Sequence, residues 1–389
     1  MKLDLLVIGG GGHVGLPLAI VFANAGLKVG IYDINGQTLA KINKGIMPFK
    51  EEGAEPLLKK VINKNLFTYS SPDPISKAKN IVIVIGTPVD EHLNPLFTQM
   101  KDLISGLMGH FRDGQTVILR STVYPGTTEK VANIFKEHGK KVNISFCPER
   151  VAEGYAIKEI KELPQIISGT SGKAVEKASA LFRKINKNLI ILEPIEAELA
   201  KLFTNTYRYI NFAIANQFYM IALDHGLDFN RIYNAVKKDY PRARSFPKPG
   251  FTAGPCLFKD TMQIAAFNDN SFFLGHSAML VNEGLPNYVV NSLKKTRKLR
   301  ELKIGILGMA FKGDSDDKRE SLAYKLKKIC EVECKNVYCS DVYIKDEGFI
   351  PAKELIKKCD LVIIGAPHKE YLRLEIPKNK LVDIWGSMK

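Results

Sequence analysis

The chain reads LDLLVIGGGGHVG from Leu3 to Gly15, an apolar run that ends at four consecutive glycines. Such a run predicts a buried strand, and the residues after the glycines carry a helical pattern. Gly10, Gly12 and Gly15 match the pattern GxGxxG. In such a turn the glycines let the backbone bend tightly, approach a pyrophosphate and pack a helix closely on a strand. We therefore expect a dinucleotide-binding α/β fold.

An acid at the end of the next predicted strand supports this interpretation. Asp33 lies 18 residues after Gly15, close to the spacing of about 20 at which an acid binds the adenosine ribose. Its carboxylate would accept hydrogen bonds from the ribose hydroxyls and repel a 2′-phosphate, so NAD is favoured over NADP. The alternative is a glycine-rich turn in a domain that has lost its cofactor. The expected cofactor contacts in this region are Gly10, Gly12, His13, Val14, Gly15 and Asp33.

Over roughly the first 190 residues, strand-like apolar runs alternate with helical patterns, which predicts a doubly wound parallel sheet. The predicted strands are Leu3–Ile8, Lys28–Tyr32, Ile81–Ile85, Thr116–Leu119, Val142–Phe146, Gln165–Ser168 and Leu189–Leu192. From Glu196 to about Leu223 there is no Gly or Pro and apolar residues recur at helical spacing, which predicts one long helix. This helix could connect two domains and carry a dimer surface, or it could be an ordinary buried helix.

The basic segment Lys294–Lys303 precedes a second set of predicted strands at Lys303–Leu307, Val337–Cys339 and Leu361–Ile364. We therefore expect two Rossmann-like, doubly wound parallel-sheet domains joined by a helical middle region with one long central helix. The predicted boundaries are 1–192, 193–293 and 294–389.

Composition limits the classes of function. The 389 residues include 56 Lys and Arg against 41 Asp and Glu, a net charge of +15. Because these charges are mostly spread along the chain without a nucleic-acid-binding motif, acidic small molecules are favoured over nucleic acid as partners. Six cysteines without paired CxxC spacing, and no visible export signal, indicate reduced thiols and a cytoplasmic location. No apolar run approaches the ~20 residues of a membrane span, so we expect a soluble protein without a membrane partner.

Reactive side chains gather in three further segments. In Gly250–Asp260, Cys256 follows Pro255 near the expected start of a helix, where the helix dipole and Lys259 would favour the thiolate nucleophile. A buried, inert cysteine is the alternative. On the long helix, Lys201 and Asn205 are four residues apart, so both could donate to an oxyanion. Otherwise they are a solvated lysine and a helix-surface asparagine.

The third segment follows a strand of the first domain. Glu149 and Glu153 are four residues apart there, and one could act as general base for water. Both could instead be solvent-facing loop acids. Thr87 and Thr122 follow two other strands, at the edge of the sheet where ligands bind, and could line the cofactor cleft. For each threonine alone, a capping or turn role is the simpler interpretation.

In their order along the whole chain, six motifs resemble those of the UDP-glucose/GDP-mannose dehydrogenase family. They are GxGxxG with Asp33, Ser121-Thr122-Val123, Pro148-Glu149 with Glu153-Gly154, Glu198-x-x-Lys201-x-x-x-Asn205, Gly254-x-Cys256-x-x-Lys259-Asp260, and Ala310–Asp314 with Arg319-Glu320-Ser321. The resemblance implies an NAD-binding domain at 1–192, a dimerisation and catalytic region at 193–293, and a UDP-binding domain at 294–389. It implies a homodimer or higher homo-oligomer and no metal.

The resemblance also implies a four-electron oxidation of the C6 alcohol of a nucleotide sugar to a uronate, with two NAD per turnover. Cys256 would trap the aldehyde as a thiohemiacetal and then carry the thioester. Lys201 and Asn205 would stabilise the oxyanions. Asp260, with Thr122 and Glu149, would handle water and protons, and the motifs do not assign the base of each step.

By the same resemblance, a set of residues would bind substrate or cofactor across the cleft. The expected substrate contacts are Glu149, Arg150, Lys201, Asn205, Arg242, Gly250, Phe251, Phe311 and Lys312, and the further cofactor contacts are Thr87, Thr122, Glu153 and Arg319. Arg242 and Arg319 resemble arginines that reach across a dimer interface, and Lys312 would meet the phosphates.

One triplet bears on the choice of sugar. Pro148-Glu149-Arg150 has Arg where UDP-glucose enzymes usually carry Phe, which is closer to the branch that oxidises UDP-N-acetyl-D-mannosamine. Lys259-Asp260 instead matches the glucose branch, so UDP-glucose and UDP-N-acetylglucosamine stay as alternative substrates. A two-electron dehydrogenase of the hydroxyacid type and a non-catalytic nucleotide-sugar-binding protein are the alternative functions.

Overall fold

The computed structural model describes residues 1–87, 90, 97–252 and 254–388. The chain forms two compact units, Met1–Phe203 and Thr204–Lys389, and each is described by itself. The expected division into three regions stays a prediction.

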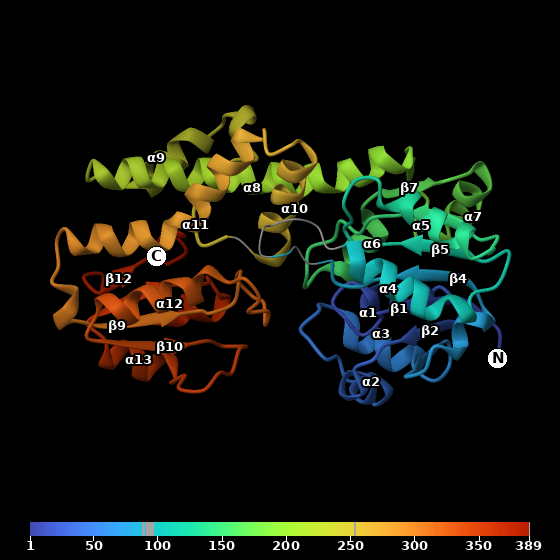
Figure 1. Ribbon diagram of the computed structural model, residues 1–389. Helices are drawn as coiled ribbons and strands as arrows, with labels where there is room; N and C mark the ends of the chain where they lie inside the picture. Colours follow the sequence, from blue (N-terminus) through green and yellow to red (C-terminus); the bar gives the residue numbers. More distant parts are fainter. Residues whose placement is uncertain (88–89, 91–96, 253, 389) are drawn as a thin grey trace. The chain divides into compact units, whose positions relative to one another are not determined.

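The first unit is built on one sheet of eight strands in the order β3-β2-β1-β4-β5-β6-β7-β8 (Figure 1). The strands are β1 (Leu3–Ile8), β2 (Val29–Tyr32), β3 (Leu66–Tyr69), β4 (Ala78–Ile83), β5 (Thr116–Leu119), β6 (Asn143–Phe146), β7 (Gln165–Gly169) and β8 (Leu189–Ile191). All seven predicted strands are present, with ends shifted by a few residues. Sequence analysis missed β3, because only Leu66 of this edge strand is fully buried and no apolar run marks it.

One pair of strands departs from the expected parallel arrangement. β6 and β7 are antiparallel, with Phe146 opposite Ser168, while the strands from β3 to β6 are all parallel. The connecting helix α6 (Ala156–Glu162) has seven residues and rises only about 10 Å. The chain therefore stays at the edge where β6 ends, and β7 runs back from there.

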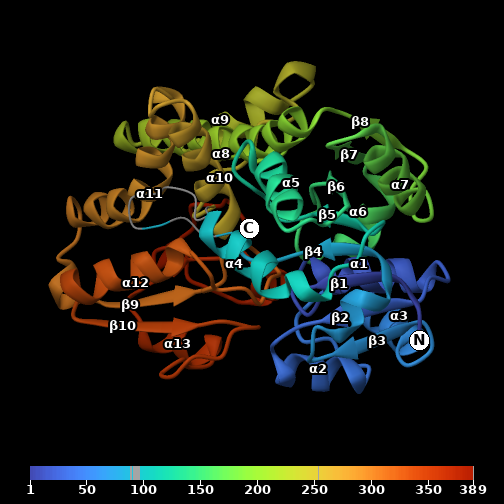
Figure 2. The ribbon, with the colours of Figure 1, turned by 45° about the vertical axis from the view of Figure 1, so that its right-hand side comes forward.

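Helices cover both faces of this sheet (Figure 2). Leu5 and Val7 of β1 pack with α1, α3, α6 and α7, whereas Leu6 and Ile8 point to the other face and pack with α4 and α5. The helices are α1 (Gly15–Asn24), α2 (Gly36–Asn43), α3 (Ala54–Val61), α4 (Phe97–Leu107), α5 (Thr127–Glu137) and α7 (Gly172–Phe182). β1 and its neighbours read as nearly continuous apolar runs because the sheet is buried on both sides.

The predicted long helix is α8 (Pro194–Asp224), with 31 residues. Pro194 suits a first helical position, where no backbone hydrogen bond is lost. Gly226 is left-handed (φ 68°) and Leu227 N–H donates to the Ala222 carbonyl at 2.8 Å, which ends the helix as a Schellman motif. Among the described residues, no helix combines the length and apolar character needed to cross a bilayer.

The second unit combines helices with a four-stranded parallel sheet in the order β10-β9-β11-β12. Its elements after α8 are α9 (Phe229–Lys237), α10 (Gly254–Phe267), α11 (Phe273–Lys294), β9 (Lys303–Leu307), α12 (Leu322–Glu333), β10 (Asn336–Ser340), α13 (Ala352–Lys358), β11 (Leu361–Ile364) and β12 (Leu381–Val382). The three predicted strands are present. The two-residue β12 lies at the edge and was not predicted.

Candidate functional site

The glycine-rich turn lies where the strand order of the first sheet reverses, between β1 and its two neighbours, β2 and β4. A Cβ on Gly15 would lie 2.7 Å from Gly10 Cα, and one on Gly10 would lie 2.8 Å from Ile31 Cγ2. These two glycines are therefore required by close packing of helix on strand. Gly12 has only the Gly9 carbonyl within 4 Å of a Cβ position, so a side chain there would fill open space at the turn. That space suits an approaching pyrophosphate.

Asp33 follows β2 and faces the same turn. Its carboxylate accepts hydrogen bonds from Gly11 N–H and Asn35 N–H, both at 2.9 Å. Val14, the N-cap of α1, makes no side-chain capping bond, and the positive end of the α1 dipole lies at this turn, where it would favour a phosphate. The His13 ring stacks on Phe49 with centroids 4.0 Å apart. These residues fit NAD, and the individual contacts stay predictions.

The turns after β4 and β5 are joined by two threonines and a serine. Thr87 Oγ donates to the Thr122 carbonyl at 2.6 Å. Ser121 Oγ donates to the Ile85 carbonyl at 2.7 Å and accepts from Ile85 N–H at 2.8 Å. The structure thus brings the predicted pair Thr87 and Thr122 together. It also gives both a role in holding the turns.

Glu149 is buried, so its interpretation as a solvent-facing acid is wrong. Its Oε2 lies 2.5 Å from the buried Arg120 guanidinium, and its Oε1 accepts from Arg150 N–H at 2.9 Å. Arg120 also donates to the Cys147 carbonyl at 2.9 Å and to Gln165 Oε1 at 3.0 Å. Sequence analysis missed Arg120, although a cation directly after a buried strand was a usable signal.

The loop after Glu149 is held on both sides. Arg150 donates through its guanidinium to the Pro164 carbonyl. Burial lowers the pKa of Arg150, and the neighbouring Glu149 partly offsets this. Gly154 N–H donates to Glu51 Oε2 at 3.0 Å, which fixes the backbone next to Glu153. Contacts of Arg150 and Glu153 with substrate or cofactor stay predictions.

Glu198, the first residue of the long-helix motif, is bound to the start of α5. Its carboxylate accepts from Gly126 N–H at 2.6 Å, Thr128 N–H at 2.8 Å and Thr128 Oγ at 2.6 Å. Burial raises the pKa of Glu198, and these hydrogen bonds oppose the shift. The carboxylate thus caps a helix N-terminus and ties the start of α8 to the first unit.

Three of the six predicted catalytic residues lie in the second unit. Cys256 is exposed in the first turn of α10, and Asp260 is completely buried one turn later on the same helix. Asn205 of α8, also buried, donates through Nδ2 to Asp260 Oδ2 at 2.6 Å. Lys259 Nζ lies 3.8 Å from Asp260 Oδ1. The interpretations of Cys256 as a buried thiol and of Asn205 as a surface residue are therefore wrong.

The other three expected catalytic residues, Lys201, Thr122 and Glu149, belong to the first unit. Lys201 precedes Asn205 by one turn of α8 and is half-buried. Thr122 and Glu149 belong to the first unit and Cys256 to the second, so their meeting around a substrate stays a prediction.

The loop before Cys256 is clamped by an asparagine pair that sequence analysis missed. Asn216 of α8 accepts from Gly250 N–H at 2.8 Å and donates to the Gly250 carbonyl at 3.3 Å. Its Nδ2 also donates to Asn282 Oδ1 at 2.9 Å, and both amides are fully buried. The available signal was a polar residue on an otherwise apolar helix face, at Asn216 and again at Asn282.

Segments far apart in the sequence meet this loop. A Cβ on Gly250 would lie 2.3 Å from the Trp385 ring, and one on Gly254 would lie 2.6 Å from the Phe311 ring. Phe251 is buried in the core of the second unit. The Lys312 ammonium lies 5.6 Å from the centre of the Phe311 ring. The structure thus brings Gly250, Gly254 and Phe311 together near Cys256.

The two predicted cross-dimer arginines have partners within the chain. Arg242 Nε donates to the Tyr240 hydroxyl at 2.7 Å. Arg319 pairs with Asp317, with Nη2 2.6 Å from Oδ2. Both guanidinium groups are on exposed residues. Their roles across a dimer interface stay predictions.

Comparisons with known proteins agree with the motifs and the fold. Three models of the UDP-glucose/GDP-mannose dehydrogenase family match: the NAD binding domain over residues 4–186, the central domain over 195–283 and the UDP binding domain over 305–388. A UDP-N-acetyl-D-mannosamine dehydrogenase of Pyrococcus horikoshii is 31% identical over 375 residues, which cover 92% of this chain and 88% of that protein.

Solved structures extend the comparison. A UDP-D-ManNAc dehydrogenase structure from Pyrococcus horikoshii has a TM-score of 0.91 at 29% identity, covering 100% of this chain and 96% of the other. A UDP-glucose dehydrogenase structure from Pyrobaculum islandicum has a TM-score of 0.89 at 25% identity, covering 100% and 95%. The predicted fold class is confirmed. The chain therefore belongs to the UDP-glucose/GDP-mannose dehydrogenase family and is an NAD-dependent nucleotide-sugar dehydrogenase.

Proposed function

We propose that the protein oxidises the C6 alcohol of a UDP-sugar to a carboxylate in two steps, through a covalent adduct on Cys256. The observation that carries this proposal is an exposed thiol at the start of α10, one turn from buried Asp260 and its partner Asn205. NAD, when bound, accepts one hydride in each oxidation, so two NAD are reduced per acid formed.

The chain's own residues have separate tasks in this scheme. The Cys256 sulfur attacks the C6 aldehyde left by the first oxidation, and the thiol proton passes to the resulting oxygen, giving a thiohemiacetal. Loss of the second hydride and of that hydroxyl proton gives a thioester, which water cleaves to the acid and the free thiol. Lys201 and Asn205 stabilise the negative oxygen in the addition steps.

Asp260 accepts a hydrogen bond from Asn205 Nδ2, which orients the Asn205 amide, and lies beside Lys259. We assign to Asp260 the proton transfers of hydrolysis, with Thr122 positioning water. Glu149 is held by Arg120 and two backbone N–H groups, so we assign it to orienting the substrate loop at Arg150.

We propose UDP-N-acetyl-D-mannosamine as the substrate. The Pro148-Glu149-Arg150 triplet and the names of several relatives at about 30% identity support it. Lys259 and the Pyrobaculum islandicum structure keep UDP-glucose as the second candidate.

The test is the ratio of NADH to acid for UDP-N-acetylmannosamine, UDP-N-acetylglucosamine, UDP-glucose and GDP-mannose. We expect a ratio of two, with the highest kcat/KM for the first sugar. Cys256→Ala should abolish acid formation, whereas Cys334→Ala, which changes another free thiol, should leave the rate unchanged. A ratio of one with an aldehyde product, or full activity in Cys256→Ala, would refute the covalent scheme.

We also propose that the protein is a homodimer formed through α8. Tyr207, Ile214, Phe218 and Ile221 recur on one stripe of the helix and are 41–62% exposed. Such a stripe on a soluble enzyme matches a self-complementary two-fold contact. Light scattering should give twice the chain mass for the native protein and the mass of one chain for Phe218→Glu.

A further inference from the structure

We propose that Asp341 and His368 are positioning residues for nucleotide-sugar binding, which act by holding the loop Met309–Asp314. This inference rests on the proposed function, because Phe311 and Lys312 of that loop are the expected substrate contacts. Neither Asp341 nor His368 was singled out by its sequence pattern.

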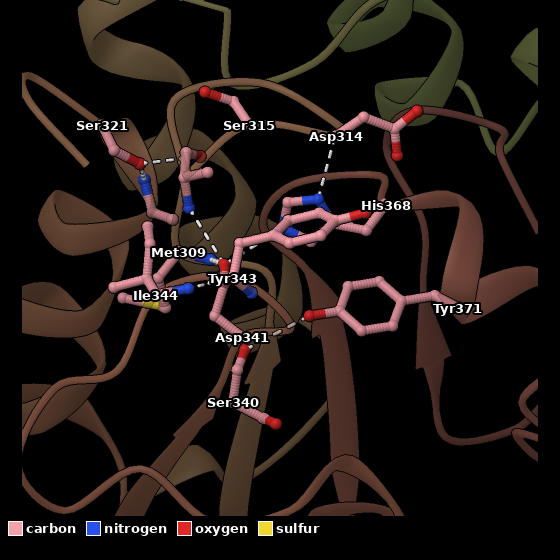
Figure 3. Close-up of polar contacts among 12 residues, drawn as sticks. Met309, Asp314, Ser315, Ser321, Ser340, Asp341, Tyr343, Ile344, His368 and Tyr371 are labelled. Atoms are coloured by element: carbon pink, nitrogen blue, oxygen red, sulfur yellow. Dashed lines mark hydrogen bonds and ion pairs between the residues drawn. The ribbon is translucent and has the colours of Figure 1, made fainter. Parts of the chain in front are cut away.

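The strand order of the second sheet brings the two residues to the loop. β9 lies between β10 and β11, and the loop follows β9. Asp341 comes directly after β10, and His368 follows β11 by four residues. Since parallel strands end at the same edge, both side chains reach the loop from either side (Figure 3).

Both carboxylate oxygens of Asp341 accept hydrogen bonds from nearby donors. Oδ2 accepts from Met309 N–H at 2.6 Å and Ala310 N–H at 3.2 Å, as well as from His368 Nε2 at 3.1 Å. Oδ1 accepts from the backbone N–H groups of Tyr343 at 2.7 Å and Ile344 at 3.0 Å. Burial alone raises the pKa of Asp341, but these hydrogen bonds outweigh it and lower the pKa below its ordinary value.

The comparison with Asp33 shows why this carboxylate holds a loop rather than a ligand. Both acids follow the strand beside the first strand of their sheet. Asp33 accepts one backbone N–H at each oxygen, which leaves lone pairs for ribose hydroxyls. Asp341 has five donors for about four lone-pair sites, so a ribose hydroxyl would have to displace a loop contact.

The hydrogen bonds of His368 determine its tautomer. Asp314 N–H can only donate, and it lies 2.9 Å from His368 Nδ1, so Nδ1 is the acceptor. The proton is therefore on Nε2, which donates to Asp341. The ring is buried, with Tyr343 and Tyr371 at centroid distances of 5.0 and 5.3 Å. The neutral imidazole thus bridges Asp341 to the far end of the loop.

The substrate residues lie between these two anchors. Phe311 and Lys312 are flanked by Ala310, bound to Asp341, and Asp314, bound to His368. The Phe311 ring packs against Gly254, two residues before Cys256. Displacing the loop would therefore move Phe311 and Lys312, the expected substrate contacts.

The experiment compares His368→Phe with His368→Gln in the full chain. Phe removes both hydrogen bonds, while Gln keeps an acceptor and a donor on one planar group. We expect His368→Phe to raise KM for the UDP-sugar at least tenfold, with kcat and the KM for NAD changed less than twofold. His368→Gln should restore KM to within about threefold. His225→Gln, an exposed histidine of the same unit, is the control.

Calorimetric binding of UDP alone separates this inference from the proposed function, since it needs no turnover. Weaker UDP binding by His368→Phe, restored by Gln, supports the positioning role even if no sugar tested is oxidised. If His368→Phe does not fold, His368→Asn, which keeps an acceptor near Nδ1 but cannot reach Asp341, should bind UDP more weakly than the native protein. Unchanged UDP affinity in a folded variant, no rescue by Gln, or an equal rise in the KM for NAD would overturn the proposal.

Discussion

The asparagine clamp at Gly250 allows a quantitative prediction for Asn216→Ala. The substitution removes three buried hydrogen bonds, two to the Gly250 backbone and one to Asn282. At a net value of about 1 kcal/mol each, the second unit should lose about 3 kcal/mol of unfolding free energy. For a unit of this size that loss lowers Tm by about 6–12 °C.

The assay is thermal unfolding followed by circular dichroism, with steady-state kinetics on the same samples. Asn234→Ala is the control, because Asn234 is an exposed asparagine on α9 of the same unit, away from the proposed dimer stripe of α8. It should shift Tm by less than about 2 °C. Asn216→Asp should be at least as damaging as Ala, since a buried carboxylate would face the Gly250 carbonyl and Asn282 Oδ1. Equal Tm values for the Asn216→Ala and Asn234→Ala variants would refute the reasoning.

Three further predictions follow from single contacts. Gly250→Ala places a Cβ 2.3 Å from the Trp385 ring, so we expect a loss of about 1–3 kcal/mol in urea unfolding and a higher KM for the UDP-sugar. An unchanged urea midpoint would contradict the close approach. Glu198→Ala leaves the start of α5 without its cap and should lower the unfolding free energy by about 2 kcal/mol. We expect hydrogen-exchange protection to be lost in the first turn of α5, and intact protection there would show that the cap is dispensable. The folded-state pKa of Asp341 is lowered, so its contribution to stability is present above its unfolded pKa of about 4 and is lost as pH falls further. Asp341→Asn should flatten the decline of Tm below pH 4, and an identical decline in both proteins would exclude this carboxylate as a cause.

The buried pair of Arg120 and Glu149 joins the ends of two neighbouring strands, β5 and β6. Breaking a buried pair by removing one partner leaves an uncompensated charge, which is more damaging than losing an exposed pair. Because Glu149 also accepts from the Arg150 and Val151 backbone, the pair fixes the start of the loop that follows it. The Glu149 carboxylate therefore has an ion-pair partner and hydrogen-bond donors that spacing along the chain does not reveal.

Local patterns were sufficient for most elements and for the family. The run before Gly9, the GxGxxG turn and the Gly-free stretch after Pro194 each act over one strand, turn or helix, so periodicity and glycine placement predict them directly. The same local logic placed Cys256 in the first turn of a helix. It failed at β3 and β12, where short edge strands carry too few buried residues to make a pattern.

Only the tertiary structure decided which polar side chains meet. Asn205 and Asp260 are 55 residues apart, and Asn216 and Gly250 are 34 apart, yet each pair shares a buried hydrogen bond. Asp341 and His368 looked ordinary in the sequence, because a buried polar group is recognised by its partners rather than by its neighbours along the chain. The physical reason is that burying such a group is costly unless the fold supplies a complementary donor or acceptor, and this supply depends on packing between distant segments.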